Sequence, residues 1–486
     1  MAVTDAVVVF GVVAAVLTVS ALISGVIDRS PLSFPLMFLG LGLALGAIGL
    51  DGVQLGPHDQ ILEVVATLTL ALVLFLDAAK LQVSEMGRRW LVPFLVLAPG
   101  TGLAIGVGAV PLALLVGFDW TLAFIGGAIL ASTDPVVLRE IVRDSRIPRA
   151  VRQTLRIEAG MNDLVVLPVV LVLIAVARSE VGGSGERVTF LAKLLIVGPV
   201  VGFAIGGFGA WLMSQVDARL GVRQEHQALY GIGLVLAAYA SATAVGGDGF
   251  LGAFAGGFAV VALNQQLCDC FLDFGETIAE MAMLLSFVLF GVVLSGLLGD
   301  VSWATAVPLA AIVIFVIRPS VLSLLLVRVK ASWRAKAIIC WFGPRGLNSL
   351  LLALLVVVAG VDGSELMLAT IGVVVIASLI VHSSTVSPVS AWYQRKALSE
   401  TLEEEREGTV ADLFGGREGA TGLIGVDDLN DRMGSPNPPI VLDVRSRAHY
   451  EADDQQISGS VRVLPDQVTD WAATQAPDRS VVAYCD

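Results

Sequence analysis

Long apolar segments alternate with short polar stretches along residues 6–392 of the chain. There are about thirteen of them, each of roughly 17–28 residues, which is the length that predicts a helix crossing a bilayer. The pattern therefore predicts an all-α polytopic membrane protein. The segments are Ala6–Val26, Pro31–Leu50, Ile61–Leu81, Trp90–Gly117, Trp120–Val137, Leu155–Ala177, Val188–Val216, Gln227–Ala244, Leu251–Leu267, Ile278–Leu298, Val301–Val327, Ala335–Gly360 and Leu366–Trp392.

Lysine and arginine are concentrated in alternate loops between these segments. The loops after the second, fourth, eighth, tenth and twelfth segments carry none. The positive-inside rule then places the N-terminus outside and the C-terminus in the cytoplasm of a cell membrane. No basic region precedes the first segment, so we expect it to be retained and not cleaved as a signal peptide. The loop after the fifth segment is the most basic, with Arg139, Arg143, Arg146, Arg149 and Arg152.

Composition supports a membrane protein with a separate acidic tail. Hydrophobic residues make up 56% of the chain and charged residues 15%, whereas a soluble domain carries about 25% charged residues. Residues 391–486 hold 18 acidic and 9 basic residues, net −9 of the total −13. This balance argues against nucleic acid as a partner. The four cysteines show no disulfide or zinc spacing, and no cofactor is expected.

Two of the predicted helices are interrupted. Pro135 follows Ser132-Thr133-Asp134 in the fifth segment, and Gly343-Pro344-Arg345-Gly346 lies within the twelfth. Proline removes a backbone N–H and disfavours helical dihedrals in the residue before it. Non-helical backbone at membrane depth is tolerated only where it is buried in protein or lines a cavity. Interruptions in corresponding halves of a transporter point to its binding site. By counting alone, segments one to six and eight to thirteen would be inverted repeats.

Carboxylates near these interruptions are candidate cation ligands. Asp134, with backbone carbonyls freed at Thr133, would suit a small hard cation, or Asp134 would only cap the cytoplasmic end of its span beside Arg139. Asp77 would point into the same cavity, or would only neutralise Lys80 at the interface. We interpret Asp248, Glu276 and Glu280 as interfacial and His382 as structural.

The sixth segment contains the sequence Glu158-Ala159-Gly160-Met161-Asn162-Asp163. An ionisable residue at membrane depth is costly and marks an ion or proton pathway, although a carboxylate at a helix end facing water is the alternative. Glu158 and Asp163 lie about 140° apart around a helix and so face different neighbours. Arg318, in the eleventh segment, needs a carboxylate or a set of carbonyls. We expect it to pair with Glu158.

The combination of these motifs resembles the monovalent cation–proton antiporters of the sodium/proton exchanger family. The resemblance rests on Thr133-Asp134-Pro135, Glu158-x-x-x-Asn162-Asp163, Arg318 and Gly343-Pro344-Arg345-Gly346, and covers residues 5–390. It implies two discontinuous crossing helices beside a dimerisation domain, and hence a homodimer in the lipid bilayer. It implies that Asp163 holds a proton or the cation in turn, with Thr133, Asp134, Asn162 and Asp77 as further ligands. Glu158 and Arg318 would be a structural ion pair, and Arg345 the charge at the second break.

Two departures from the family pattern bear on ion choice. Ala159 stands where many members have serine, and Leu164 where glycine is common. They leave Na⁺, K⁺ and Li⁺ open as the cation exchanged for H⁺. The expected function is electroneutral exchange in pH homeostasis and not enzyme catalysis. A cation channel is the alternative, because it would not need a carboxylate whose proton the ion displaces.

The tail is expected to follow a charged linker. We divide the chain into a transmembrane domain (1–392), a cytoplasmic linker (393–420) and a small α/β domain (421–486). The strand ending Asp443-Val444-Arg445, the Ile457-Ser458-Gly459 turn and a second strand before Cys485 resemble a rhodanese-like domain. Gln456 replaces its usual histidine, and one residue follows Cys485. We therefore expect a partial domain without sulfurtransferase activity, either a fragment or a regulatory appendage.

Overall fold

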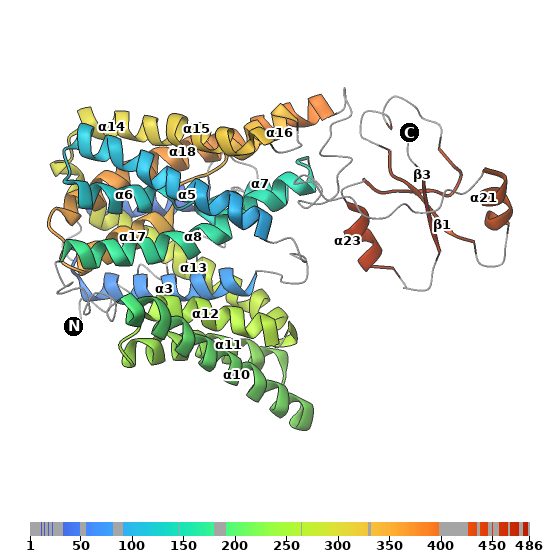
Figure 1. Cartoon of the computed structure of the whole chain (residues 1–486), viewed down its shortest axis with the longest axis horizontal. Coiled ribbons are helices and arrows are strands. Elements are labelled where there is room, and N and C mark those ends of the chain that lie inside the picture. The colour runs from blue at the N-terminus through green and yellow to red at the C-terminus, as the bar shows by residue number, and fades with distance from the viewer. Residues whose placement is uncertain are drawn as a thin grey trace. The chain divides into compact units, whose positions relative to one another are not determined.

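The structure is a computed structural model, drawn in Figure 1. It describes residues 11, 14, 18, 22, 33–48, 55–80, 91–144, 146–178, 191–263, 265–328, 332–397, 426–434, 438–445, 450, 456–464, 467–475 and 480–484. Helices dominate up to residue 397. They are α2 (Phe34–Ile48), α3 (Gln60–Ala79), α5 (Leu91–Pro111), α6 (Trp120–Ala131), α7 (Pro135–Arg143), α8 (Arg149–Ala177), α10 (Gly198–Leu220), α11 (Gln224–Ala244), α12 (Gly249–Leu263), α13 (Gln265–Leu297), α14 (Trp303–Ile312), α15 (Arg318–Leu325), α16 (Trp333–Trp341), α17 (Leu347–Val358) and α18 (Ser364–Ala397).

The predicted polytopic helical fold is confirmed. Eight helical stretches of the described residues are long and apolar enough to cross a membrane, and four further apolar helices are shorter. The predicted first segment lies almost entirely outside the described residues, and the other twelve coincide with helices. Both predicted interruptions are present: Ser132–Asp134 separates α6 from α7, and Phe342–Gly346 separates α16 from α17.

Several helices extend beyond the predicted segments. We placed the start of the sixth segment at Leu155, but α8 begins at Arg149; α13 begins at Gln265, well before the predicted Ile278. Hydropathy marks the apolar stretch and not the end of the helix. A helix can continue into polar sequence, because its backbone hydrogen bonds lie within the helix itself.

The described residues fall into two compact units. One comprises Met1–Val137, Ile157–Val321 and Gly343–Ser384; the other comprises Leu138–Arg156, Leu322–Phe342 and Thr385–Asp486. The first unit holds most of the helices and the buried apolar core. Within it, the backbones of α10 and α12 are in direct contact. A Cβ atom added at Gly202 would overlap Gly252, and one added at Gly206 would overlap Gly256. Such small-residue contacts bring helices close together in a membrane.

The tail contains a small parallel sheet. Its strands β1 (Ile440–Asp443), β2 (Val461–Arg462) and β3 (Val481–Tyr484) lie in the order β2-β1-β3, with helices α21 (Val426–Met433) and α23 (Val468–Ala473) in the same region of the chain. Asp443 is fully buried. Burial raises the pKa of Asp443, but hydrogen bonds from Arg445 and Tyr484 outweigh that effect and hold the pKa at about 2. Cys485 and most of the predicted linker lie outside the described residues.

Candidate functional site

Asp163 lies on α8 with 3% of its surface exposed, between the two helix interruptions. Its Oδ1 accepts a hydrogen bond from Ser132 Oγ at 2.8 Å, and its Oδ2 accepts one from Asn348 Nδ2 at 2.7 Å. Ser132 belongs to the gap between α6 and α7, and Asn348 is the second residue of α17. Both carboxylate oxygens are therefore held by neutral donors, one from each discontinuous helix.

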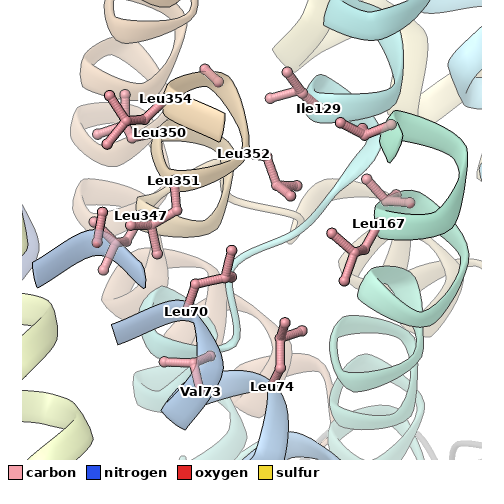
Figure 2. Close-up of a cluster of buried hydrophobic side chains, with 14 of the residues drawn as sticks. Leu70, Val73, Leu74, Ile129, Leu167, Leu347, Leu350, Leu351, Leu352 and Leu354 are labelled. Atoms are coloured by element: carbon pink, nitrogen blue, oxygen red, sulfur yellow. The ribbon is translucent and has the colours of Figure 1, made fainter. Parts of the chain in front are cut away.

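Leucine side chains enclose the space beside this carboxylate. Leu70 and Leu74 from α3, Leu167 from α8 and Leu352 from α17 line it together with Asp163 and Asn348. Figure 2 shows these four leucines on their three helices. The enclosed space is too narrow to hold a water molecule. A charge on Asp163 therefore depends on protein donors for its solvation.

Each interruption places a charged side chain against a helix end that borders the other interruption. Asp134 Oδ2 accepts from the backbone N–H of Leu347 at 2.6 Å, at the start of α17. Arg345 Nη1 donates to the carbonyls of Ala131 and Ser132, at 3.0 and 2.7 Å, at the end of α6. The Asp134 backbone N–H also donates to Pro344 O at 2.9 Å. Because helix N-termini are partly positive and C-termini partly negative, each side chain neutralises the end it contacts.

Two glycines make this crossing possible. A Cβ atom at Gly346 would overlap the Asp134 carboxylate, and one at Gly343 would overlap the Arg318 guanidinium. Any larger residue at either place would displace a buried charged group. The Gly-Pro-Arg-Gly sequence is therefore needed for packing as well as for the interruption of the helix.

Glu158 and Arg318 form the predicted ion pair. Arg318 Nη1 lies 2.5 Å from Glu158 Oε1, and Nη2 lies 2.8 Å from Oε2. Glu158 is 4% exposed and Arg318 is 6% exposed. The contact is bidentate and buried, the geometry in which an arginine–carboxylate pair is strongest. Glu158 is therefore not a carboxylate at a helix end facing water.

Asn162 joins the first interruption to a neighbouring helix. Its Nδ2 donates to Thr133 Oγ1 at 2.8 Å, and its Oδ1 accepts from Thr101 Oγ1 of α5 at 2.8 Å. All of these polar side chains are buried. Their predicted part in cation binding stays a prediction, but the structure brings Thr133, Asp134, Asn162 and Asp163 to one place.

Comparison with known proteins identifies the family. The sequence model described as "Sodium/hydrogen exchanger, transmembrane" matches residues 13–392. The chain belongs to this family. The K(+)/H(+) antiporter NhaP of Alkalimonas amylolytica is 28% identical over 398 residues, covering 81% of this chain and 67% of that protein. The K(+)/H(+) antiporter NhaP2 of Shewanella sp. (strain MR-4) is 27% identical over 380 residues, covering 76% of this chain and 64% of that protein. The chain thus spans about two thirds of these relatives' length.

Solved structures share the exchanger fold. The sodium proton antiporter MjNhaP1 from Methanocaldococcus jannaschii at pH 8 has a TM-score of 0.64 at 17% sequence identity, covering 80% of this chain and 100% of that chain. At this identity the likeness concerns the fold alone.

The sequence left two possible positions open for Asp134 and for Asp77 in the exchanger, and the structure distinguishes between them. Asp134 does more than cap the end of its own span: it is 1% exposed, and its carboxylate accepts from the first N–H of α17. Lys80 pairs with Glu276, at 3.3 Å, and Asp77 is buried, near enough for its charge to act on Asp163. Asp77 therefore belongs to the surroundings of Asp163 and not to the interface.

The sequence did not single out two residues whose side chains are hydrogen-bonded to Asp163 among the described residues. Ser132 and Asn348 are adjacent to the predicted interruptions, and that position is the signal that would have suggested them. His382 Nδ1 lies 3.1 Å from Ser378 Oγ, which accepts from the Arg345 backbone N–H, and the structural role of this histidine stays a prediction.

Proposed function

We propose that the chain is a secondary active antiporter that exchanges Na⁺ or K⁺ for H⁺, with Asp163 binding the cation and the proton in turn. The observation that carries this proposal is the state of Asp163: buried, between both discontinuous helices, and without an ion-pair partner among the described residues. Arg318 is engaged with Glu158, and Arg345 with the end of α6. A buried carboxylate without a fixed counter-charge needs a mobile cation, either H⁺ or a metal ion.

The exchange follows from competition for one group. A carboxylate must lose its proton to bind a metal ion, so each cation that binds Asp163 releases a proton. Glu158 and Asp134 are held by structural partners, so in this proposal Asp163 alone exchanges the proton for the cation. One charge then moves in each direction, which makes the exchange electroneutral. Thr133, Asp134, Asn162 and Asp77 would complete the cation's surroundings.

K⁺ is a second candidate for the physiological cation. The similar curated proteins are named K(+)/H(+) antiporters, while the similar solved structure is named a sodium proton antiporter. These names support K⁺ and Na⁺ equally as candidates for the transported cation.

The remaining cellular features belong to the same proposal. Alternation of basic loops supports a cell-membrane protein with its N-terminus outside and its C-terminus in the cytoplasm. The family resemblance supports a homodimer. The parallel sheet of the tail agrees with a rhodanese-like α/β domain.

Proteoliposomes test the proposed exchange directly. The purified chain is reconstituted in vesicles that are acidic inside, and Na⁺, K⁺, Li⁺ or choline is added outside while a fluorescent dye reports the proton gradient. An antiporter lets one or more of the metal ions, but not choline, dissipate the gradient. A channel instead carries the cation down a membrane potential with no proton counter-movement, and that result would contradict the proposal.

A further inference from the structure

A threonine on a neighbouring helix is tied to the first interruption through one buried amide. Thr101 lies on α5, and its hydroxyl donates to Asn162 Oδ1 at 2.8 Å. The same amide donates from Nδ2 to Thr133 Oγ1, also at 2.8 Å. Thr101, Asn162 and Thr133 are 7%, 4% and 1% exposed. The exchange mechanism above gives no role to Thr101, although this chain of hydrogen bonds begins there.

The packing of α5 against α6 supports this position of Thr101. A Cβ atom added at Gly127 of α6 would overlap the carbonyl oxygen of Ile105 on α5, so the two backbones are in direct contact there. Thr101 lies about one turn before Ile105 on α5. The helix that carries Thr101 is therefore held firmly against the helix that ends at the first interruption.

Both ends of the Asn162 amide are occupied in this arrangement. Its oxygen accepts from Thr101, and its nitrogen donates to Thr133. Thr133 belongs to the non-helical stretch between α6 and α7, where no regular helical hydrogen bonds fix the backbone. The amide therefore connects a residue of this stretch to a regular helix. Thr133 is also one of the proposed cation ligands, so what holds it bears on how a cation is bound.

We propose that Thr101 is a positioning residue that acts through Asn162 to hold Thr133 in place, and so sets how strongly the exchanger prefers one alkali cation over another. The inference rests on the proposed function. Na⁺, K⁺ and Li⁺ carry the same charge and differ in size, so a site distinguishes them by the spacing and flexibility of its oxygen ligands. Without the Thr101 hydroxyl, Asn162 and Thr133 gain freedom to move. The site then adapts to cations of different size.

The test compares three substitutions in the proteoliposome assay. Thr101→Val keeps the branched shape of the side chain and removes the hydroxyl, whereas Thr101→Ser keeps the hydroxyl and removes a methyl group. Thr370→Val on α18 is the matched control, because Thr370 is 1% exposed and its hydroxyl donates to the Leu366 carbonyl of its own helix at 2.7 Å. The apparent KM and the maximum rate are measured separately for Na⁺, K⁺ and Li⁺ at one fixed pH.

For Thr101→Val, we expect the apparent KM of the preferred cation to rise about two- to tenfold, the range that corresponds to the loss of one neutral hydrogen bond. The KM values of the other cations change less, so the ratio between them and the preferred cation moves toward one. The maximum rate stays close to that of the wild type, because Thr101 is not proposed to touch the moving ion. Thr101→Ser and Thr370→Val keep the wild-type ratio.

A Thr101→Val protein with a reduced maximum rate and an unchanged KM ratio would overturn the inference, because the hydroxyl would then matter only for the integrity of the protein. An equal shift of the ratio in Thr101→Ser or Thr370→Val would also overturn it, since the hydrogen bond to Asn162 would not be the cause. A wild type with equal KM for all three cations would have no preference for Thr101 to set, and that result likewise contradicts the inference.

Two further outcomes are separated by the design. If Thr101→Val is not recovered as folded protein, Thr101→Ala is judged by the same KM ratio. A wild-type protein without any exchange overturns the proposed function and this inference with it. An active, selective wild type whose KM ratio is unchanged in the variant overturns only the inference.

Discussion

Removing one partner of the Glu158–Arg318 pair is expected to destabilise the protein strongly. The two side chains are joined by two hydrogen bonds, at 2.5 and 2.8 Å, and both residues are less than a tenth exposed. Glu158→Gln or Arg318→Met leaves the other charge buried without its partner. The cost of such a change is about 3–5 kcal/mol. Arg318 also packs on the Gly343 backbone in the second interruption, so its loss loosens that segment as well.

The pair between Lys80 and Glu276 is the control for this prediction. Its atoms are 3.3 Å apart, but the two side chains are 36% and 38% exposed. Exposed ion pairs contribute about 0–1 kcal/mol, since water solvates both charges after the pair is broken. Lys80→Met or Glu276→Gln is therefore expected to change stability much less than either variant of the buried pair.

Thermal unfolding of the purified variants in detergent measures the difference. Membrane proteins often unfold irreversibly, so the apparent Tm values rank the variants at one heating rate. The double variant Glu158→Gln/Arg318→Met is expected to lose less than the two single losses combined, because the second change removes the charge that the first one stranded. Strictly additive losses, or equal losses at the exposed control pair, would refute the reasoning.

Three other predictions follow from the structure. Gly346→Ala is expected to reduce exchange and lower Tm, because the added atom displaces Asp134. Gly160→Ala is the control: nothing lies within 4 Å of its added atom, so the exchange rate and Tm are expected to stay at wild-type values. Equal behaviour of the two variants would be evidence against the crossing of the two interrupted helices. One-for-one exchange predicts that a potential imposed with valinomycin leaves the rate unchanged once pH effects are corrected, and a steep voltage dependence would require a second titrating carboxylate. Because the pKa of Asp443 is about 2 in the folded tail and near 4 in an unfolded chain, its stabilisation is present above about pH 4 and is lost as pH falls toward 2. The protection of residues 440–443 from hydrogen exchange, relative to the intrinsic exchange rate at each pH, should fall over that interval in the whole protein, and Asp443→Asn should remove this pH dependence.

The helix interruptions could be predicted because their causes are local. Pro135, and the Gly343-Pro344 step, act on the residues beside them whatever surrounds them. The Glu158–Arg318 pair could be predicted by elimination, since a buried guanidinium needs an acidic or carbonyl partner. Both inferences use chemistry that one or two residues carry in the sequence.

The contacts across the two gaps could not be predicted in the same way. Asp134 caps α17, more than two hundred residues later in the chain, and this contact follows from how two separate interruptions cross. Ser132 and Asn348 are neutral and small, so neither hydropathy nor charge marks them. Their role depends on three-dimensional placement beside Asp163. Hydropathy likewise misplaced the starts of α8 and α13, because those helices continue into polar sequence.

The most direct test of the central claim is proton-coupled exchange by Asp163→Asn. The substitution keeps the size of the side chain and removes the negative charge that is proposed to bind the cation and the proton in turn. The account predicts a folded, reconstituted protein in which neither Na⁺ nor K⁺ dissipates the proton gradient at any pH. Asp119→Asn, the same change at the exposed cap of α6, is expected to exchange like the wild type. Wild-type exchange by Asp163→Asn would contradict the account.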